Sequence, residues 1–153
     1  FISGFVMGEI ICNATYYTLA RTFNPQIIIW ALPLFFTIAT IMQTNNTCDI
    51  ERDKEAGRKT LPIILGKERS GHVIALAQMF ALGIAGAYTV NHALPWGTFI
   101  MALAVVVCAR NIVNLYNIDY SYKTRPQAMQ SIAKQAVLVN GFYFVAIVIG
   151  ALL

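Results

Sequence analysis

The chain has 153 residues, of which 58% are hydrophobic and only 12% are charged. Soluble globular domains have roughly 45–50% apolar and about 25% charged residues, so this composition argues against a soluble domain. The mean hydropathy of +0.61 indicates that the lipid bilayer is the solvent of this protein.

Five apolar segments follow one another along the chain, each close to the ~20 residues that a helix needs to cross the hydrocarbon core. Their approximate ranges are 2–20, 26–44, 73–90, 94–113 and 135–153. Any one of them could be a buried helix of a soluble protein, but five in succession make that interpretation poor. We therefore predict an all-α membrane protein with five transmembrane helices.

The first segment contains one acidic residue, Glu9, with Asn13 one helical turn later. An ionisable side chain inside a membrane helix is costly and is a candidate for function, so Glu9 is a possible cavity residue. The second segment has no charged residue. Its Pro33 is tolerable in a membrane helix, because neighbouring helices can satisfy the backbone carbonyl that a proline frees.

Asn45, Asp49 and Asp53 follow the second segment at a spacing of four residues. If the helix continues past Thr44, they form a stripe on one face, with two carboxylates one turn apart. The C-terminal end of a helix disfavours negative charge, so we expect a compensating positive charge. Mg²⁺ takes oxygen ligands, often only one or two carboxylates, with water and substrate phosphate completing its shell. We therefore predict that these three residues are metal ligands.

The residues after the aspartates suit a phosphate-bearing ligand. Gly57 is placed to end the helix in a left-handed cap, and Pro62 prevents the helix from continuing. Arg58 and Lys59 lie between them. We predict that these two bases bind the diphosphate oxygens that the metal leaves free.

A solvated helix end is the alternative interpretation of the stripe. Nearby bases would then neutralise the acids, with Glu55 and Lys59 as an i, i+4 pair. This interpretation explains neither the spacing of the stripe nor its place at the membrane boundary, where unpaired carboxylates are costly. Glu51 and Glu55 point away from the stripe by helical spacing, so we expect their alanine variants to lose little activity.

The later segments add fewer candidates. Arg110, Asn111 and Asn114 in the fourth segment either line a cavity or join helices by hydrogen bonds, and Arg110 is kept as a possible cavity residue. The three cysteines occur singly, without a CxxC pair. We expect them to be small apolar fillers rather than parts of a zinc site or a disulfide framework.

Lysine and arginine gather in the loops after the second and fourth segments, whereas the opposite side holds only Arg21. With five spans these two loops share one side of the membrane, and short cytoplasmic loops retain basic residues. We therefore predict a multi-pass protein of the cell membrane, with the loop 45–71 in the cytoplasm. This asymmetry accounts for the net charge of +4, so no nucleic acid partner is expected.

The string NxxxDxxxDxxxGRKTLPIILG, at 45–66, resembles the second aspartate-rich motif of the UbiA superfamily of intramembrane prenyltransferases. Its GRKTLP form is most similar to the 1,4-dihydroxy-2-naphthoate polyprenyltransferases of menaquinone synthesis. The resemblance implies a nine-helix bundle around a central cavity, in which residues 1–153 form the second part, helices five to nine. The family often has an acidic residue near the start of its fifth helix, which supports Glu9.

For function, the resemblance implies Mg²⁺-dependent transfer of a polyprenyl group from an allylic diphosphate to an aromatic acceptor within the bilayer. The suggested acceptor is 1,4-dihydroxy-2-naphthoate, which loses its carboxylate as carbon dioxide, and another aromatic acceptor remains open. Asp49 and Asp53 would be the catalytic residues through the metal. The first aspartate-rich motif of the family does not occur in this chain. We therefore expect catalysis to need the missing N-terminal helices of the same enzyme.

Two hypotheses from other classes remain open. In half of a cation-coupled transporter, the stripe would coordinate a translocated ion, but transporter coupling sites lie near the bilayer midplane rather than at its boundary. A non-catalytic membrane scaffold would make no use of the charged loop. Magnesium-dependent binding of a prenyl diphosphate distinguishes the three.

Overall fold

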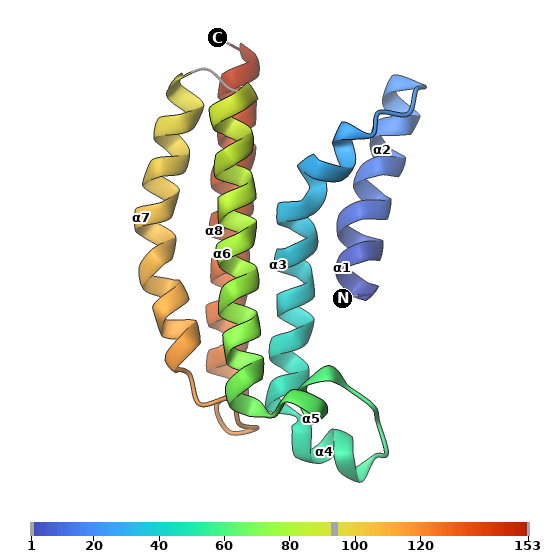
Figure 1. Cartoon of the computed structure of the whole chain (residues 1–153), viewed down its shortest axis with the longest axis vertical. Coiled ribbons are helices and arrows are strands. Elements are labelled where there is room, and N and C mark those ends of the chain that lie inside the picture. Colours follow the sequence, from blue (N-terminus) through green and yellow to red (C-terminus); the bar gives the residue numbers. More distant parts are fainter. Residues whose placement is uncertain (1, 93–94, 153) are drawn as a thin grey trace.

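The computed structural model describes residues 2–92 and 95–152, and every regular element within them is a helix. Phe1, Leu94 and Leu153, which belong to the predicted domain and spans, lie outside the described residues. Four helices are long and apolar enough to cross a membrane: α3 (Gln26–Cys48), α6 (Lys67–His92), α7 (Pro95–Asn117) and α8 (Arg125–Leu152). Figure 1 shows them running alongside one another. The predicted all-helical membrane fold is confirmed.

The first predicted span is helical along its whole length but consists of three consecutive pieces. These are α1 (Ile2–Gly4), the π-helical η1 (Phe5–Ile10) and α2 (Ile11–Ala20). A π-helical turn widens the helix and changes its hydrogen-bond pattern. No single piece therefore reaches the length of a span, although together they cover the predicted range. The segment ends at Arg21, whose backbone is left-handed with φ of 55°.

Two glycines allow this first segment to pack closely against α3. A Cβ atom at Gly8 would lie 2.7 Å from the Cα atom of Phe35, and one at Gly4 would lie 2.5 Å from the Phe35 carbonyl oxygen. Real Cβ atoms do not approach backbone so closely, so only glycine permits this contact. Small residues at helix contacts are typical of membrane proteins, because packing rather than the hydrophobic effect joins the helices.

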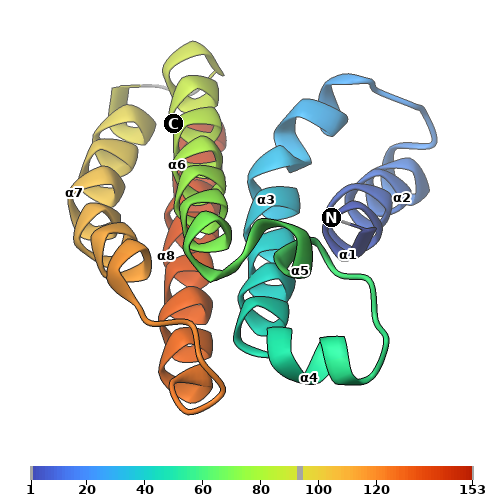
Figure 2. The same ribbon diagram turned by 60° about the horizontal axis from the view of Figure 1, so that its bottom comes forward.

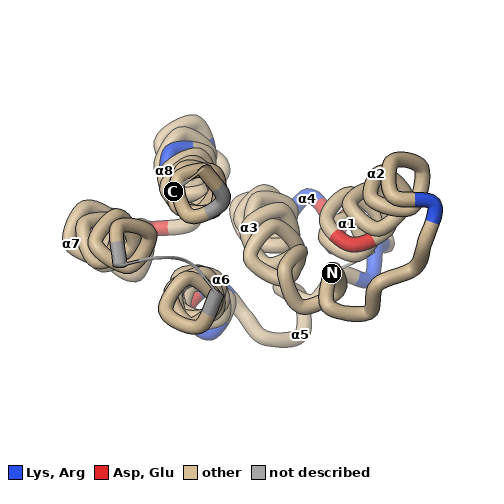
Figure 3. The backbone as a smooth tube through the Cα atoms, turned by 90° about the horizontal axis from the view of Figure 1, so that it is seen from above, with Lys and Arg blue, Asp and Glu red and all other residues tan. Residues whose placement is uncertain are grey.

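The bundle of α3, α6, α7 and α8 has two buried cores, and the first segment lies on the other side of α3 (Figure 3). One core joins α6, α7 and α8 through residues that include Ala85, Ala104 and Val139. The second core lies toward the motif and contains Cys48, Ile74, Leu115, Tyr120, Ala128 and Ile132. Cys48 and Cys108 are buried in these cores, as expected of apolar fillers.

Polar side chains also join the helices inside the bundle. Gln78 of α6 donates a 2.6 Å hydrogen bond to the Thr40 hydroxyl of α3. Asn140 of α8 donates one of 2.8 Å to the Thr37 hydroxyl, also on α3. Such bonds satisfy polar groups that would otherwise be unpaired in hydrocarbon, and they fix the rotation of α3 against its neighbours.

The long helices extend beyond the predicted spans, which corrects the predicted bounds of the loop 45–71. Residues 45–48 belong to α3 and residues 67–71 belong to α6. Only 49–66 connects these helices, and it contains α4 (Ile50–Glu55) and α5 (Leu61–Leu65). The hydropathy pattern ends where polar residues begin, whereas backbone hydrogen bonds continue through polar residues at the membrane interface.

The connections that follow α3 and α7 lie at the same end of the bundle (Figures 1 and 2). This agrees with the predicted placement of both basic loops on one side. Arg21 lies in the connection at the opposite end, between α2 and α3.

The substitution Gly8→Ala should destabilise the protein, because the added methyl group forces the first segment away from α3. Overpacking of this kind costs about 1–3 kcal/mol. Gly83→Ala in α6 is the matched control, because a Cβ atom there meets nothing within 4 Å. Alanine is the better helix former, so the control should melt at the same or a higher temperature. Equal melting temperatures for both variants in detergent would contradict the close packing.

Single cysteines at Lys67 and at Asn91, in a background without the three native cysteines, should be labelled from opposite sides of the membrane. These positions lie at the two ends of α6. A membrane-impermeant maleimide added to sealed vesicles gives the readout. Labelling of both positions from one side would show that α6 does not cross the bilayer.

Candidate active site at the end of helix α3

The aspartate-rich motif lies where α3 passes into α4. The Asp49 N–H donates to the Asn45 carbonyl at 3.2 Å, and the Asp53 N–H donates to the Asp49 carbonyl at 2.9 Å. Asp49 itself departs from helical geometry, with φ of −102° and ψ of 14°. The predicted helical spacing is therefore kept in the backbone bonds, but the helix axis breaks at Asp49.

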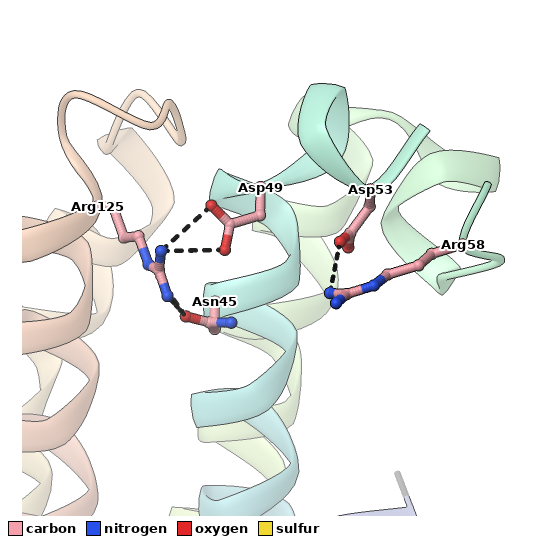
Figure 4. Close-up of polar contacts among 5 residues, drawn as sticks. All are labelled: Asn45, Asp49, Asp53, Arg58 and Arg125. Carbon is pink, nitrogen blue, oxygen red and sulfur yellow. Dashed lines mark hydrogen bonds and ion pairs between the residues drawn. The ribbon is translucent and has the colours of Figure 1, made fainter. Parts of the chain in front are cut away.

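Asn45 and Asp49 hold the same guanidinium group, that of Arg125 at the start of α8 (Figure 4). Arg125 Nη2 donates to Asn45 Oδ1 at 2.6 Å, and its Nε donates to the same oxygen at 3.1 Å. Its Nη1 lies 3.2 Å from Asp49 Oδ2. Two oxygen-bearing side chains from successive turns thus converge on one positive charge.

Asp53 pairs with a different arginine. Arg58 Nη1 lies 3.1 Å from Asp53 Oδ1, and the carboxylate side chain is only 5% exposed. Figure 4 shows Asp53 and Arg58 on the other side of α3 from Arg125. The expectation of one stripe on one face is therefore wrong, because the helix breaks at Asp49 and the Asp53 side chain lies on the other side of α3.

The turn after α4 explains why Arg58 reaches Asp53. Gly57 has a left-handed φ of 66°, which confirms its predicted role as a helix cap. The Gly57 N–H donates to the Lys54 carbonyl at 3.0 Å, and the Arg58 N–H donates to the Asp53 carbonyl at 2.8 Å. These two bonds form a Schellman motif, which folds Arg58 back over the residue five positions earlier. Pro62 then lies in the first turn of α5.

The connection between α7 and α8 positions Arg125. Tyr120 is buried over Gly71 of α6, and its hydroxyl donates to the Leu115 carbonyl at 2.6 Å. Burial raises the pKa of the Tyr120 phenol, so it stays a neutral donor. The Thr124 hydroxyl donates to the Asp119 carbonyl and fixes the residue just before Arg125. These contacts fix the connection that leads into α8, and so they place Arg125 beside the motif.

A cation–π contact also joins the connection between α3 and α6 to the connection between α7 and α8. The guanidinium carbon of Arg52 in α4 lies 3.7 Å from the centre of the Tyr122 ring. Such contacts contribute about 0.5–1 kcal/mol at exposed sites. Together with Arg125, this contact ties the short helix α4 to the connection before α8.

The donor set fits a hard divalent cation. Carboxylate and amide oxygens from Asn45 and Asp49 already converge on a positive group, whereas the Asp53 carboxylate pairs with Arg58 on the other side of α3. Among the described residues, no three acidic, histidine or cysteine side chains gather as a metal cluster. A metal here would therefore take few protein ligands and several water or phosphate oxygens, which is the usual coordination of Mg²⁺.

Three other predicted residues of the loop lie apart from these contacts. Lys59 is exposed, and Glu55 is also exposed. The Glu55–Lys59 pair of the alternative interpretation does not form within the described residues, because the turn at Gly57 interrupts the helix between them. Glu51 instead approaches Lys54 at 3.9 Å on the exposed face, as expected for a residue outside the site.

Glu9 and Arg110 form no contact with the motif among the described residues. Glu9 lies on η1 and is only 6% exposed, and Asn13 donates a 3.4 Å hydrogen bond to its Oε2. Its Oε1 is buried without a partner among the described residues, and π-helical turns are frequent at functional sites. Asn111 joins α7 to α8 through a 3.0 Å bond to Gln135 Oε1, which supports its structural role.

Arg125 is the site residue that the motif did not predict. Its partner Asp49 lies 76 residues earlier in the sequence, so no local spacing relates the two. The available signal was the placement of both basic loops on one side of the membrane, which brings Arg125 to the same end as the motif.

Comparison with known proteins identifies the family of this bundle and motif. The model of the UbiA prenyltransferase family matches residues 1–136. The chain belongs to the UbiA prenyltransferase family. It is therefore an integral membrane protein, and the predicted resemblance is confirmed.

Curated relatives within this family include two bacterial enzymes. A 1,4-dihydroxy-2-naphthoate octaprenyltransferase of Bacillus subtilis is 34% identical over 67% of this chain and 33% of its own length. One of Haemophilus influenzae is 28% identical over 90% of this chain and 44% of its own length. The chain thus spans less than half the length of these relatives.

A human relative, UbiA prenyltransferase domain-containing protein 1, is 30% identical over 65% of this chain and 33% of its own length. No solved structure gives a significant match.

A double-mutant cycle should show that Arg125 and Asp49 stabilise each other. Because the Asp49 side chain is only 14% exposed, we expect Arg125→Gln and Asp49→Asn to couple by about 1 kcal/mol in unfolding free energy. The control cycle combines Lys54→Gln with Glu51→Gln, an exposed pair that should show much weaker coupling. Equal coupling in both cycles would mean that the contact with Arg125 is incidental.

Proposed function

We propose that this end of α3 binds Mg²⁺ and the diphosphate of a polyprenyl substrate, and that the protein transfers the prenyl group to an aromatic acceptor. The observation that carries the proposal is the convergence of Asn45 and Asp49 oxygens on one positive group. The names of two relatives favour 1,4-dihydroxy-2-naphthoate as the acceptor, with the menaquinone pathway as the context.

Each charged residue has a role in this proposal. Asp49 holds the metal, with Asn45 as a weaker ligand. Asp53 is the third proposed ligand, and its side chain would have to leave Arg58 to reach the same ion. Mg²⁺ supplies electrostatic stabilisation of the charge that develops on the departing diphosphate. Arg58 and Lys59 bind the diphosphate oxygens, and the planar guanidinium of Arg58 suits a bidentate contact.

Arg125 already holds the Asn45 and Asp49 oxygens that would hold a metal, so its guanidinium would have to leave them for a metal to bind there. The guanidinium, at the start of α8, would then be free to pair with the diphosphate. In the absence of substrate this contact keeps Asn45 and Asp49 close together, and breaking it is part of the cost of binding.

The setting of the reaction also remains a proposal. We place the protein in the cell membrane with the motif in the cytoplasm, where both basic loops would lie. The match covers less than half the length of the two bacterial relatives, and we propose that catalysis uses further N-terminal helices. The transporter and scaffold hypotheses receive no support from the family match.

Prenyl transfer to 1,4-dihydroxy-2-naphthoate should depend on both aspartates. The assay uses membranes in which this chain is co-expressed with the N-terminal helices of a family member, and it follows the prenylated product in the presence of Mg²⁺. Asp49→Asn or Asp53→Asn should lower the rate by at least ~10²-fold, because each removes electrostatic support from the leaving group.

The matched controls are Glu51→Gln and Glu55→Gln, which remove the same charge from the exposed part of the loop. They should keep a rate near that of the wild type. Wild-type rates in both aspartate variants would contradict the proposed site, as would equal losses in all four variants.

A further inference from the structure

A polar cleft of about 340 Å³ opens between α7 and α8, and none of its residues belongs to the motif. It is lined by Val107, Arg110, Asn111, Asn114, Lys134 and Leu138. The side chains of Arg110, Asn114 and Lys134 are exposed, so the cleft faces the surroundings of the bundle. Two basic residues from different helices thus share one opening.

Neither basic residue has a partner within the part of the chain that the structure describes. No acidic residue lines the cleft, and the ion pairs of the described residues involve other side chains. Asn111 is already bonded to the Ser131 carbonyl and to Gln135, so it forms the floor of the cleft. Arg110, Lys134 and the Asn114 amide therefore remain available to bind an anion.

The cleft lies at the depth where lipid phosphates can be reached. Arg110 precedes the end of α7 at Asn117 by seven residues, which is about 10 Å along the helix. Lys134 follows the start of α8 at Arg125 by nine residues, which is about 13 Å. Long basic side chains at this depth extend toward the interface and place their charge among the headgroups.

The surface beside the cleft is apolar. Val106 on α7 is 71% exposed and Val137 on α8 is 72% exposed, and both lie about one turn from the basic residues toward the middle of the membrane. Val107 and Leu138 line the cleft itself. A free phosphate ion would make no use of these residues, whereas an acyl chain would cover them.

We propose that this cleft binds an anionic phospholipid from the leaflet on the motif side, with its phosphate between Arg110 and Lys134. Asn114 donates a further hydrogen bond to the headgroup, and an acyl chain lies along the exposed valines. Basic pockets between transmembrane helices recognise anionic headgroups in this way. The site is independent of the proposed metal site, so each can fail without the other.

Native mass spectrometry of the full protein with dioleoyl phosphatidylglycerol and dioleoyl phosphatidylcholine tests the proposal. The wild type should retain the anionic lipid in preference to the zwitterionic one. The double variant Arg110→Gln/Lys134→Gln should bind the anionic lipid on the order of tenfold more weakly, because two charges near the headgroup are lost. Arg110→Lys/Lys134→Arg should restore binding, which separates charge recognition from misfolding.

The matched control is Arg69→Gln/Lys123→Gln, which removes two exposed bases from the same end of the protein. It should keep the lipid affinity of the wild type. An equal loss of lipid affinity in both double variants would show that only the net charge matters, and it would refute the proposed site. Displacement of the lipid by millimolar inorganic phosphate would show a free-anion site instead, and an unchanged affinity in Arg110→Gln/Lys134→Gln would also refute the proposal.

Discussion

The arrangement of this protein around its motif depends on one electrostatic constraint, namely that poorly exposed carboxylates near the membrane need a positive partner. Arg125 meets this requirement for Asp49, and Arg58 meets it for Asp53. Each arginine comes from a different part of the fold. The Arg125 contact therefore joins the end of α3 to α8, and the Arg58 contact joins α4 to the turn that follows it.

The packing of the bundle keeps these contacts in place. Cys48, directly before Asp49, and Ala128, one turn after Arg125, belong to the same buried core. Tyr120 fills the space over Gly71 and closes that core from the side of the α7–α8 connection. The contact between Asp49 and Arg125 therefore depends on how α3 packs against α8.

The sequence predicted the features that are local and missed those that depend on tertiary packing. Apolar length predicted the four long helices, and the glycine after α4 predicted the left-handed cap, because both are properties of neighbouring residues. The break at Asp49 and the π-helical turn at Glu9 left no local pattern. Arg125 could not be assigned to Asp49 from spacing, because the path between them passes through α6 and α7.

We propose that the oxygens which hold Arg125 also hold a divalent cation. Electron paramagnetic resonance of Mn²⁺, titrated into the reconstituted protein with a prenyl diphosphate, measures this directly. Asp49→Asn should weaken Mn²⁺ binding on the order of tenfold or more, since a carboxylate ligand is lost, while Glu51→Gln should leave it unchanged. Equal Mn²⁺ affinity in wild type and Asp49→Asn would show that Asp49 is not a metal ligand.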